Sequence, residues 1–195
     1  LSVVFVLGTR KTSGKYQCLV TANRPRHMNN RLKSDFFIRD VLDVAPELLG
    51  KSLVRQFDDG TIIRYRITEV EDYRGTEDLA CHASKGRTPR TEVMFHEGGK
   101  VYVYLIYGMY WLLNLVTGEE GHASAVLIRG IEGFSGPGRL GRELKLDKSF
   151  YGEDLINSTR LWVEDAEPIA EFKTSKRIGI GYAGEWADKL WRFYL

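Results

Sequence analysis

A chain of 195 residues with 43% hydrophobic, 12% aromatic and 28% charged residues has the size and composition of one globular domain. No segment is apolar for long enough to predict a transmembrane helix, and two cysteines do not suggest a disulfide-rich secreted protein. The formal net charge is +2, but residues 1–27 hold five basic and no acidic residues, so the remainder of the chain has a net charge of −3. Binding of a polyanion to this remainder would therefore need a local basic surface.

Residues 1–27 differ from the rest of the chain. The segment LSVVFVLG is apolar but short, and no basic residues precede it, which is not typical of a secretory signal. An amphipathic pattern begins near Met28. We therefore expect residues 1–27 to be an extension outside the fold and residues 28–195 to form the domain.

The first predicted elements are two helical turns and two strands. SDFFIRDVLDVAPELLG, residues 34–50, predicts a short amphipathic helix, a second turn marked by proline, and an end at Gly50. KSLVRQF (51–57) and TIIRYRITEVEDY (61–73) predict two strands joined by the turn DDG. A polar loop follows.

The second half of the chain predicts a hairpin, another strand and a helix. ASAVLIRGI, residues 123–131, has the pattern of a strand, and FSGPGRLGREL predicts a helix that Ser135 can cap. RIGIGYAGEWADKLWRFYL mixes strand and glycine-turn signals. Because adjacent strands outnumber helices, we expect an α+β fold: one domain with a curved antiparallel sheet, flanking helices and a protruding hairpin.

The second predicted strand carries two glutamates. Alternation places Ile67, Glu69, Glu71 and Tyr73 on one face, so the glutamates continue an apolar side. A buried lone charge is costly, so such a carboxylate is either paired with a cation or used in chemistry. A strand-end glutamate that faces water is the commoner alternative. Arg129, inside the apolar stretch AVLIRGIE, can pair with one of these glutamates or bind a phosphate or a reaction centre.

YVYLIYGMYWLLN predicts a hairpin with its turn at Tyr107 and Gly108. A three-residue loop ending at the glycine aligns Tyr104, Tyr110 and Asn114 on one face, whereas a two-residue loop sends the asparagine to the other face. We expect the three-residue loop, because glycine suits its last position. Either loop leaves the tyrosine at the tip, where it packs back over a neighbouring strand or enters another molecule.

The loop CHASKGRTPR holds one histidine, His82, and the basic residues Lys85, Arg87 and Arg90. A solvated loop is the plain interpretation of this pattern. No second ligand pair with CxxC or HxxxH spacing accompanies Cys81 and the histidine, so we expect no metal site and no cofactor. The zinc deaminase signature is also absent from the sequence.

Five ordered segments resemble the alkyladenine (3-methyladenine) DNA glycosylase family, from about Phe36 to the C-terminus: EVEDYRGTEDLACHASKGRTPRTEVMF, GGKVYVYLIYGMYWLLN, AVLIRGIE, SGPGRLGREL and RIGIGYAGEWADKLWRFY. The resemblance implies a monofunctional enzyme of base excision repair. Such an enzyme rotates an alkylated or deaminated purine out of duplex DNA and hydrolyses its N-glycosidic bond. The implied substrates are 3-methyladenine, 7-methylguanine, hypoxanthine and ethenoadenine.

The resemblance also implies catalytic and binding roles. Glu71 matches the general base that activates water, and Arg129 matches the arginine that helps to hold this water. No lysine falls at a matching position, so a lyase step is not expected. The general acid for neutral lesions is not assigned.

The implied base pocket is aromatic. Tyr73, His82 and Tyr104 match the residues that hold the extruded base, and Asn114 matches the residue that crowds the 2-amino group of guanine. Tyr107 matches the side chain that fills the gap left in the duplex. Further expected DNA contacts are Met109, Tyr110, Lys85, Arg87 and Arg90.

The sequence departs from the family in two places. Glu132 leads to Gly138 more directly than in many relatives, and the chain ends at Leu195 where relatives usually continue. The alternative function is a non-catalytic nucleic-acid-binding module of the same fold, which would not need an ionised Glu71. A metal hydrolase is disfavoured by the ligand spacing. We expect a monomer that acts on double-stranded DNA and not on membranes, in the cytoplasm, at the nucleoid of a bacterium or in the nucleus of a eukaryote.

Overall fold

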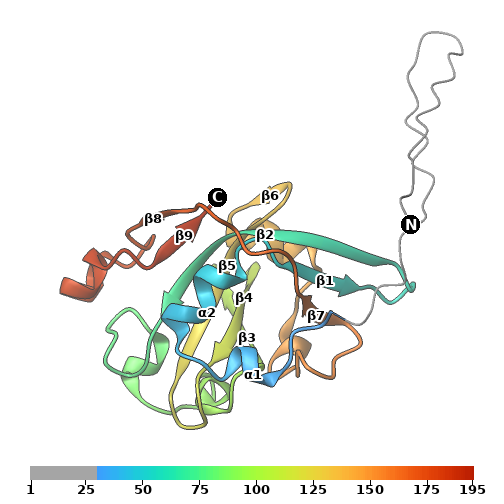
Figure 1. Cartoon of the computed structure of the whole chain (residues 1–195). Coiled ribbons are helices and arrows are strands. Elements are labelled where there is room, and N and C mark those ends of the chain that lie inside the picture. Colours follow the sequence, from blue (N-terminus) through green and yellow to red (C-terminus); the bar gives the residue numbers. More distant parts are fainter. Residues whose placement is uncertain (1–29) are drawn as a thin grey trace, which may run out of the picture.

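The computed structural model describes residues 30–195, so the predicted extension at residues 1–27 lies outside the described residues (Figure 1). The described chain forms an antiparallel sheet of nine strands with a few short helices, which confirms the predicted α+β fold. The main strand order is β3-β4-β5-β2-β1-β7, while β6 pairs with β5, and β9 pairs with β2 and β8.

The strands are β1 (Ser52–Gln56), β2 (Ile62–Tyr73), β3 (Val101–Ile106), β4 (Tyr110–Thr117), β5 (Ser124–Ile131), β6 (Phe134–Ser135), β7 (Leu161–Glu164), β8 (Lys173–Ser175) and β9 (Arg192–Tyr194). The α-helices are α1 (Ser34–Phe37), α2 (Val41–Leu48) and α3 (Pro137–Glu143). Short 3-10 helices lie at His82–Lys85, Glu92–Phe95, Lys148–Phe150 and Gly181–Asp188. The segment predicted as a polar loop thus contains two 3-10 helices.

The predicted N-terminal helical pattern forms α1 and α2. The side chain of Asp40 accepts a hydrogen bond from the N–H of Leu42 at 2.9 Å and so caps α2. Pro46 lies inside this helix, which ends two residues later, and Gly50 follows with a φ of 83°. The apolar face of α2 packs into the main core of the domain.

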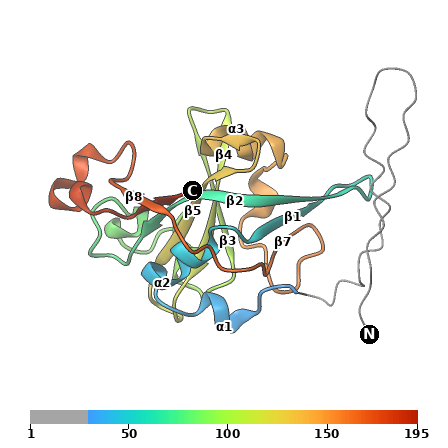
Figure 2. The same cartoon turned by 45° about the horizontal axis from the view of Figure 1, so that its top comes forward.

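The sheet has a different partner on each face. On one face, apolar residues of the strands pack with α2 and α3 in the main core. On the other face, Tyr102, Val116 and Ala125 pack against residues of the two 3-10 helices that follow β2, among them Met94. Figure 2 shows the hairpin of β3 and β4 beside α3, with the C-terminus near the middle of the view and the segment that follows β8 to the left.

A pair of bulges reverses the faces of β2. The register between β2 and β5 shifts twice, with Thr68 as the extra residue on β2 and Arg129 as the extra residue on β5. As a result, Ile67 and Val70 both pack in the main core, and Glu71 points to the opposite face. The prediction that the glutamates continue the apolar side of Ile67 is therefore wrong, because simple alternation does not reveal a bulge.

The hairpin has the predicted loop length but a shifted position. Ile106 pairs with Tyr110, so the three loop residues are Tyr107–Met109 and the loop starts one residue later than expected. The N–H of Met109 donates to the carbonyl of Ile106 at 3.1 Å, and Tyr107 and Gly108 have φ angles of 53° and 67°. Positive φ at both central residues is the requirement of a type I′ turn, which explains why the glycine stands in the middle.

The connection from β5 to α3 is a tight turn. Ile131 of β5 pairs with Phe134 of β6 across the turn at Glu132 and Gly133. Ser135 pairs with Gly130 instead of capping α3, whose N-cap is Gly136. The predicted N-cap at Ser135 is therefore wrong, because strand pairing holds this residue away from the helix start.

Candidate active site

A cavity of about 440 Å³ lies on the sheet face opposite the main core, between the β3–β4 hairpin and residues 178–182 near the C-terminus. Its volume is in the range of small-molecule sites and is sufficient for one nucleobase. Seven predicted site residues line it: Tyr73, His82, Arg90, Tyr104, Tyr107, Asn114 and Arg129. The structure therefore brings together residues that are separated by up to 56 positions in the sequence.

Four strands place side chains in one row below the cavity. Tyr102 pairs with Asn114, Asn114 pairs with Leu127, and Leu127 pairs with Glu71. Directly paired residues of antiparallel strands point to the same face, so the sheet itself sets this row. Asn114 is buried, and its amide nitrogen donates to the carbonyl of Tyr102 at 3.0 Å, which fixes the side chain.

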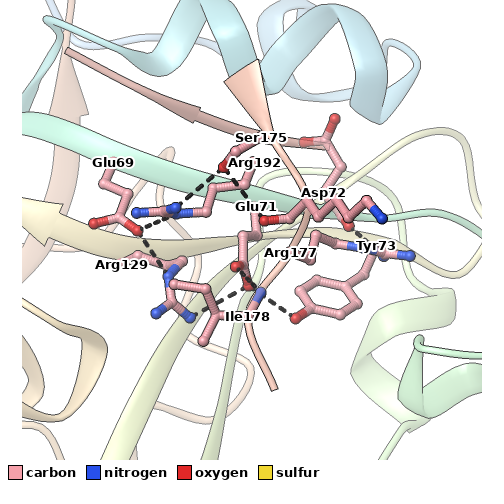
Figure 3. Close-up of polar contacts among 10 residues, drawn as sticks. Glu69, Glu71, Asp72, Tyr73, Arg129, Ser175, Arg177, Ile178 and Arg192 are labelled. Carbon is pink, nitrogen blue, oxygen red and sulfur yellow. Dashed lines mark hydrogen bonds and ion pairs between the residues drawn. The ribbon is translucent and has the colours of Figure 1, made fainter. Parts of the chain in front are cut away.

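Glu71 lies behind the cavity wall and is 0% exposed. Its Oε1 accepts a hydrogen bond from the N–H of Ile178 at 2.7 Å (Figure 3). Its Oε2 accepts from the hydroxyl of Tyr73 at 3.0 Å and from the guanidinium of Arg129 at 3.3 Å. All three partners line the cavity, whereas Glu71 itself does not contribute to the lining. The alternative of a glutamate that faces water is wrong.

The surroundings of Glu71 act on its charge in both directions. Burial raises the pKa of its carboxyl above the usual value, and the nearby Glu69 adds to this effect. Arg129, the N–H of Ile178 and the hydroxyl of Tyr73 oppose the rise because they favour the charged form. A carboxylate with these partners is a stronger proton acceptor than a solvated glutamate and keeps a fixed orientation.

Arg129 bridges the two glutamates of β2. Its Nε donates to Glu69 at 2.9 Å and its Nη1 donates to Glu71 at 3.3 Å, so the ion pair, one of the two alternatives for this arginine, is present. Arg192 of β9 also donates to Glu69, at 2.6 Å (Figure 3). Arg129 occupies the bulge position of β5, and bulges commonly redirect side chains beside functional sites.

Aromatic rings from three segments line the cavity. His82 and Tyr104 meet edge to face with ring centroids 4.7 Å apart, and Tyr73 lines the cavity from β2. Nδ1 of His82 lies 2.9 Å from the hydroxyl of Tyr102. Burial, followed by the charges of Arg90 and Lys85, lowers the pKa of His82 to about 4, so this imidazole is neutral near pH 7. Such walls can hold a flat ring system by stacking.

The C-terminal segment contributes to the site in a way that its sequence pattern does not reveal. Arg177 is buried, forms two hydrogen bonds to Asp78, and lies over the ring of Tyr73 with a distance of 4.8 Å to the centroid (Figure 3). The next residue, Ile178, supplies the N–H that binds Glu71, and Tyr182 lines the cavity rim with 71% exposure. RIGIGY was noted as a matching segment, but nothing in its local pattern shows that it meets β2.

The expected DNA contacts do not all lie in one place. Tyr107 and Met109 at the hairpin tip are 81% and 63% exposed. Tyr110 is half-buried and lies beside Arg142 of α3, with 5.3 Å from the guanidinium carbon to the ring centroid. The three basic loop residues are all exposed, and of these Arg90 lines the cavity whereas Lys85 and Arg87 do not.

Residues 30–195 contain no group of three or more His, Cys, Asp or Glu side chains arranged to hold a metal ion. Within the same residues, none of the helices combines the length and apolar character that a membrane span requires.

Comparison with known proteins gives one family and many relatives. Residues 35–135 and 132–195 match the family model described as Methylpurine-DNA glycosylase (MPG). A protein of Methanocella arvoryzae is 45% identical over 183 residues, covering 84% of this chain and 91% of the relative. Proteins of Legionella pneumophila (strain Lens) and Desulfitobacterium hafniense (strain Y51) are 47% identical over 174 residues and 42% identical over 193 residues. Both of these alignments cover 85% of this chain, and they cover 94% of the Legionella protein and 95% of the Desulfitobacterium protein. All three relatives are named as candidate 3-methyladenine DNA glycosylases.

Proposed function

The chain belongs to the methylpurine-DNA glycosylase family of hydrolytic DNA glycosylases, and from this premise we propose that it excises alkylated or deaminated purines with Glu71 as the general base. The protein is a hydrolase of N-glycosyl bonds, of the 3-methyladenine DNA glycosylase type, and DNA is its substrate. The proposed substrates are 3-methyladenine, 7-methylguanine, hypoxanthine and ethenoadenine in double-stranded DNA, and the proposed active form is a monomer.

The first step of the proposal is extrusion of the purine. A base inside the helical stack cannot reach a buried carboxylate, so it must rotate out at a cost of a few kcal/mol. Stacking of a base on protein aromatics is worth roughly 1–3 kcal/mol. Tyr107, which is 81% exposed at the hairpin tip, can occupy the vacated space, while Tyr73, His82 and Tyr104 hold the extruded base.

The second step is hydrolysis. Departure of the purine leaves positive charge at C1′, as in other glycoside cleavages. Glu71 takes a proton from the attacking water and stabilises this charge, and Arg129 orients the carboxylate and the water. Asn114 stands in the same row of the sheet, where its fixed amide limits which purines fit.

One observation carries the proposal: a fully buried glutamate is held by three donors directly behind an aromatic cavity. This observation also weighs against a non-catalytic binding module. Burying a carboxylate is costly, and a surface that only binds phosphates gains nothing from it. A binding module would favour neutral or basic groups at this position.

The test compares the parent protein with Glu71→Gln on a duplex that carries a single hypoxanthine or ethenoadenine. After incubation in EDTA, alkali cleaves the strand at each abasic site, and the products are separated by length. We expect strand breaks with the parent and almost none with the variant, because the amide cannot accept the proton from water. Glu132→Gln, an exposed glutamate in the β5–β6 turn, is the control and should behave as the parent.

Two results would overturn the catalytic assignment. One is equal release of the base by the parent and Glu71→Gln. The other is release by neither protein while both still bind the duplex, which would favour the binding module.

A further inference from the structure

Glu69 stands behind Arg129 and does not line the cavity. Its Oε1 accepts two short hydrogen bonds, from Nε of Arg129 at 2.9 Å and from Nε of Arg192 at 2.6 Å. The side chains of Glu69 and Arg129 are each 12% exposed, and that of Arg192 is 22% exposed. Water therefore screens these charges poorly. A base in the cavity would touch Arg129 but not Glu69.

The bulges between β2 and β5 set the place of Glu69. This residue pairs with Gly130 of β5 and with Tyr194 of β9, so its backbone lies between two strands. A Cβ on Gly130 would lie 2.9 Å from Oγ1 of Thr68 and 3.1 Å from Cβ of Glu69, so a glycine lets the two strands approach closely here. Because backbone pairing already joins β9 to β2, holding this edge does not depend on the pair of Arg192 and Glu69 alone.

Arg129 is bound more closely to Glu69 than to Glu71. The 2.9 Å from its Nε to Glu69 is typical of a charge-assisted hydrogen bond, whereas the 3.3 Å from its Nη1 to Glu71 exceeds that range. A guanidinium that turned its two-pronged edge to Glu71 would stabilise the charged carboxylate further and weaken it as a proton acceptor. The bond to Glu69 opposes this rotation, because it occupies the Nε of that edge.

The charged or titratable side chains around Glu71 come from five segments of the chain: Glu69, Asp72 and Tyr73 from β2, Tyr104 from β3, Arg129 from β5, Arg177 from the C-terminal segment and Arg192 from β9. Burial raises the pKa of Asp72, Tyr73 and Tyr104, which favours their uncharged forms. Arg177 is paired with Asp78.

The remaining charges form one linked group that cancels. Glu69 and Glu71 supply two negative charges, and Arg129 and Arg192 supply two positive charges. When Glu71 accepts a proton from water, this group acquires a charge of +1. Without the charge of Glu69, the group would start at +1 and would reach +2 beside a sugar carbon that is itself becoming positive. Both changes are unfavourable, because like charges repel strongly in a poorly hydrated site.

We propose that Glu69 is a positioning residue, which holds Arg129 where its guanidinium orients Glu71 without neutralising it and so keeps Glu71 effective as the base. This inference rests on the proposed function, in which Glu71 takes the proton from water. In this role Glu69 touches neither the purine nor the water. It acts through Arg129, and Arg192 limits how much negative charge Glu69 contributes.

The experiment measures single-turnover excision of 7-methylguanine from a duplex as a function of pH, with enzyme in saturating excess and with correction for loss of the base without enzyme. This cationic purine leaves as a neutral base and needs no proton, so the loss of rate at low pH reports on the base. Burial raises the pKa of Glu71 above its usual value, so protonation of Glu71 should produce this acid limb of the profile.

For Glu69→Gln we expect the plateau rate constant to fall by about tenfold, because Arg129 is no longer held in place. The acid limb should move to lower pH, since Glu71 binds a proton less readily beside an uncompensated positive charge. The affinity for the duplex should stay within about twofold of the parent, because Glu69 lies outside the cavity lining.

Two further variants separate charge from structure. Arg192→Gln removes a positive charge from the same group, so its acid limb should move the opposite way, to higher pH. Glu69→Asp keeps the charge on a shorter side chain, so its acid limb should match that of the parent while its rate constant lies between those of the parent and Glu69→Gln. Glu132→Gln in the β5–β6 turn is the matched control and should change neither quantity. Unfolding in urea establishes that each variant is folded.

Three outcomes would overturn the proposal. The first is a Glu69→Gln variant with the rate constant and acid limb of the parent. The second is a loss of rate in all three variants of Glu69 and Arg192 with an unmoved acid limb, which would assign these residues to structure alone. The third is a parent profile without an acid limb. Release of 7-methylguanine by Glu71→Gln at the parent rate, or its release by neither protein, would instead count against the proposed function itself.

Discussion

The buried ion pair between Arg177 and Asp78 should control the stability of the site. Both side chains have 0% exposure, with Nη1–Oδ2 and Nη2–Oδ1 distances of 2.5 and 2.9 Å. Asp78 also accepts a hydrogen bond from the N–H of Ala80 at 3.0 Å, and Arg177 lies between the rings of Tyr73 and Trp191. In Asp78→Ala, the guanidinium stays buried without its counter-charge.

The expected loss follows from this burial. Removing one partner of a buried ion pair costs about 3–5 kcal/mol, because the remaining charge is not compensated. A domain of this size loses roughly 2–4 °C in Tm per kcal/mol, so the Tm of Asp78→Ala should fall by about 6–20 °C. Against a total stability of about 5–15 kcal/mol, the variant should still fold at low temperature.

The assay is unfolding in urea and by heat, followed by tryptophan fluorescence, to which Trp191 beside Arg177 contributes directly. Asp188→Ala is the control, since its ion pair with Lys176 at 2.6 Å is exposed on both sides. This variant should unfold almost as the parent does, because water screens such pairs. If Asp78→Ala unfolded at the same midpoint as Asp188→Ala, the reasoning about the buried charge would be refuted.

Two further predictions concern the hairpin tip and a buried acid. Tyr107→Ser should weaken capture of the extruded base by about 5- to 150-fold, which is the equivalent of one lost stacking contact. Tyr107→Trp should retain capture, because it keeps an aromatic ring at the tip. An unchanged affinity of Tyr107→Ser for DNA that carries the lesion would contradict insertion of the tip into DNA. Asp72 is 0% exposed, neither of its oxygens has a hydrogen-bond partner among the described residues, and burial raises its pKa well above the usual value. The folded state therefore holds this proton more tightly than the unfolded state, so stability falls as the pH rises above the unfolded pKa of about 3.9. Asp72→Asn should remove this part of the pH dependence of stability. The measurement is the urea midpoint of unfolding at several pH values between 4 and 7. If the midpoint changed with pH equally in the variant and the parent, the reasoning would be wrong.

The sequence by itself determined the elements and several local features. The spacing of turn residues predicted β1, β2, the hairpin and β5, because turns and alternation depend on neighbouring residues only. It also predicted Tyr107 at the hairpin tip, and it offered an ion pair with a glutamate of β2 as one of two alternatives for Arg129. The resemblance of ordered segments indicated the family, which the comparisons confirmed.

The tertiary structure determined which residues, distant in sequence, lie beside each other. The bulges at Thr68 and Arg129 arise from the pairing of two distant strands, and they turn Glu71 away from the main core and toward the cavity. Simple alternation could not supply this, because an extra residue in one strand is visible only against its partner.

Packing of the C-terminal segment against β2 determined the remaining contacts of the site. Ile178 donates its N–H to Glu71 across 107 positions of sequence, and Arg177 supports Tyr73 from the same segment. The basic loop looked uniform in sequence, and all three of its basic residues are exposed, yet only the fold shows that Arg90 lies against His82 and Tyr104 at the cavity while Lys85 and Arg87 do not line it. Local sequence patterns specify backbone conformation, whereas the packing of distant segments determines which side chains line the same cavity.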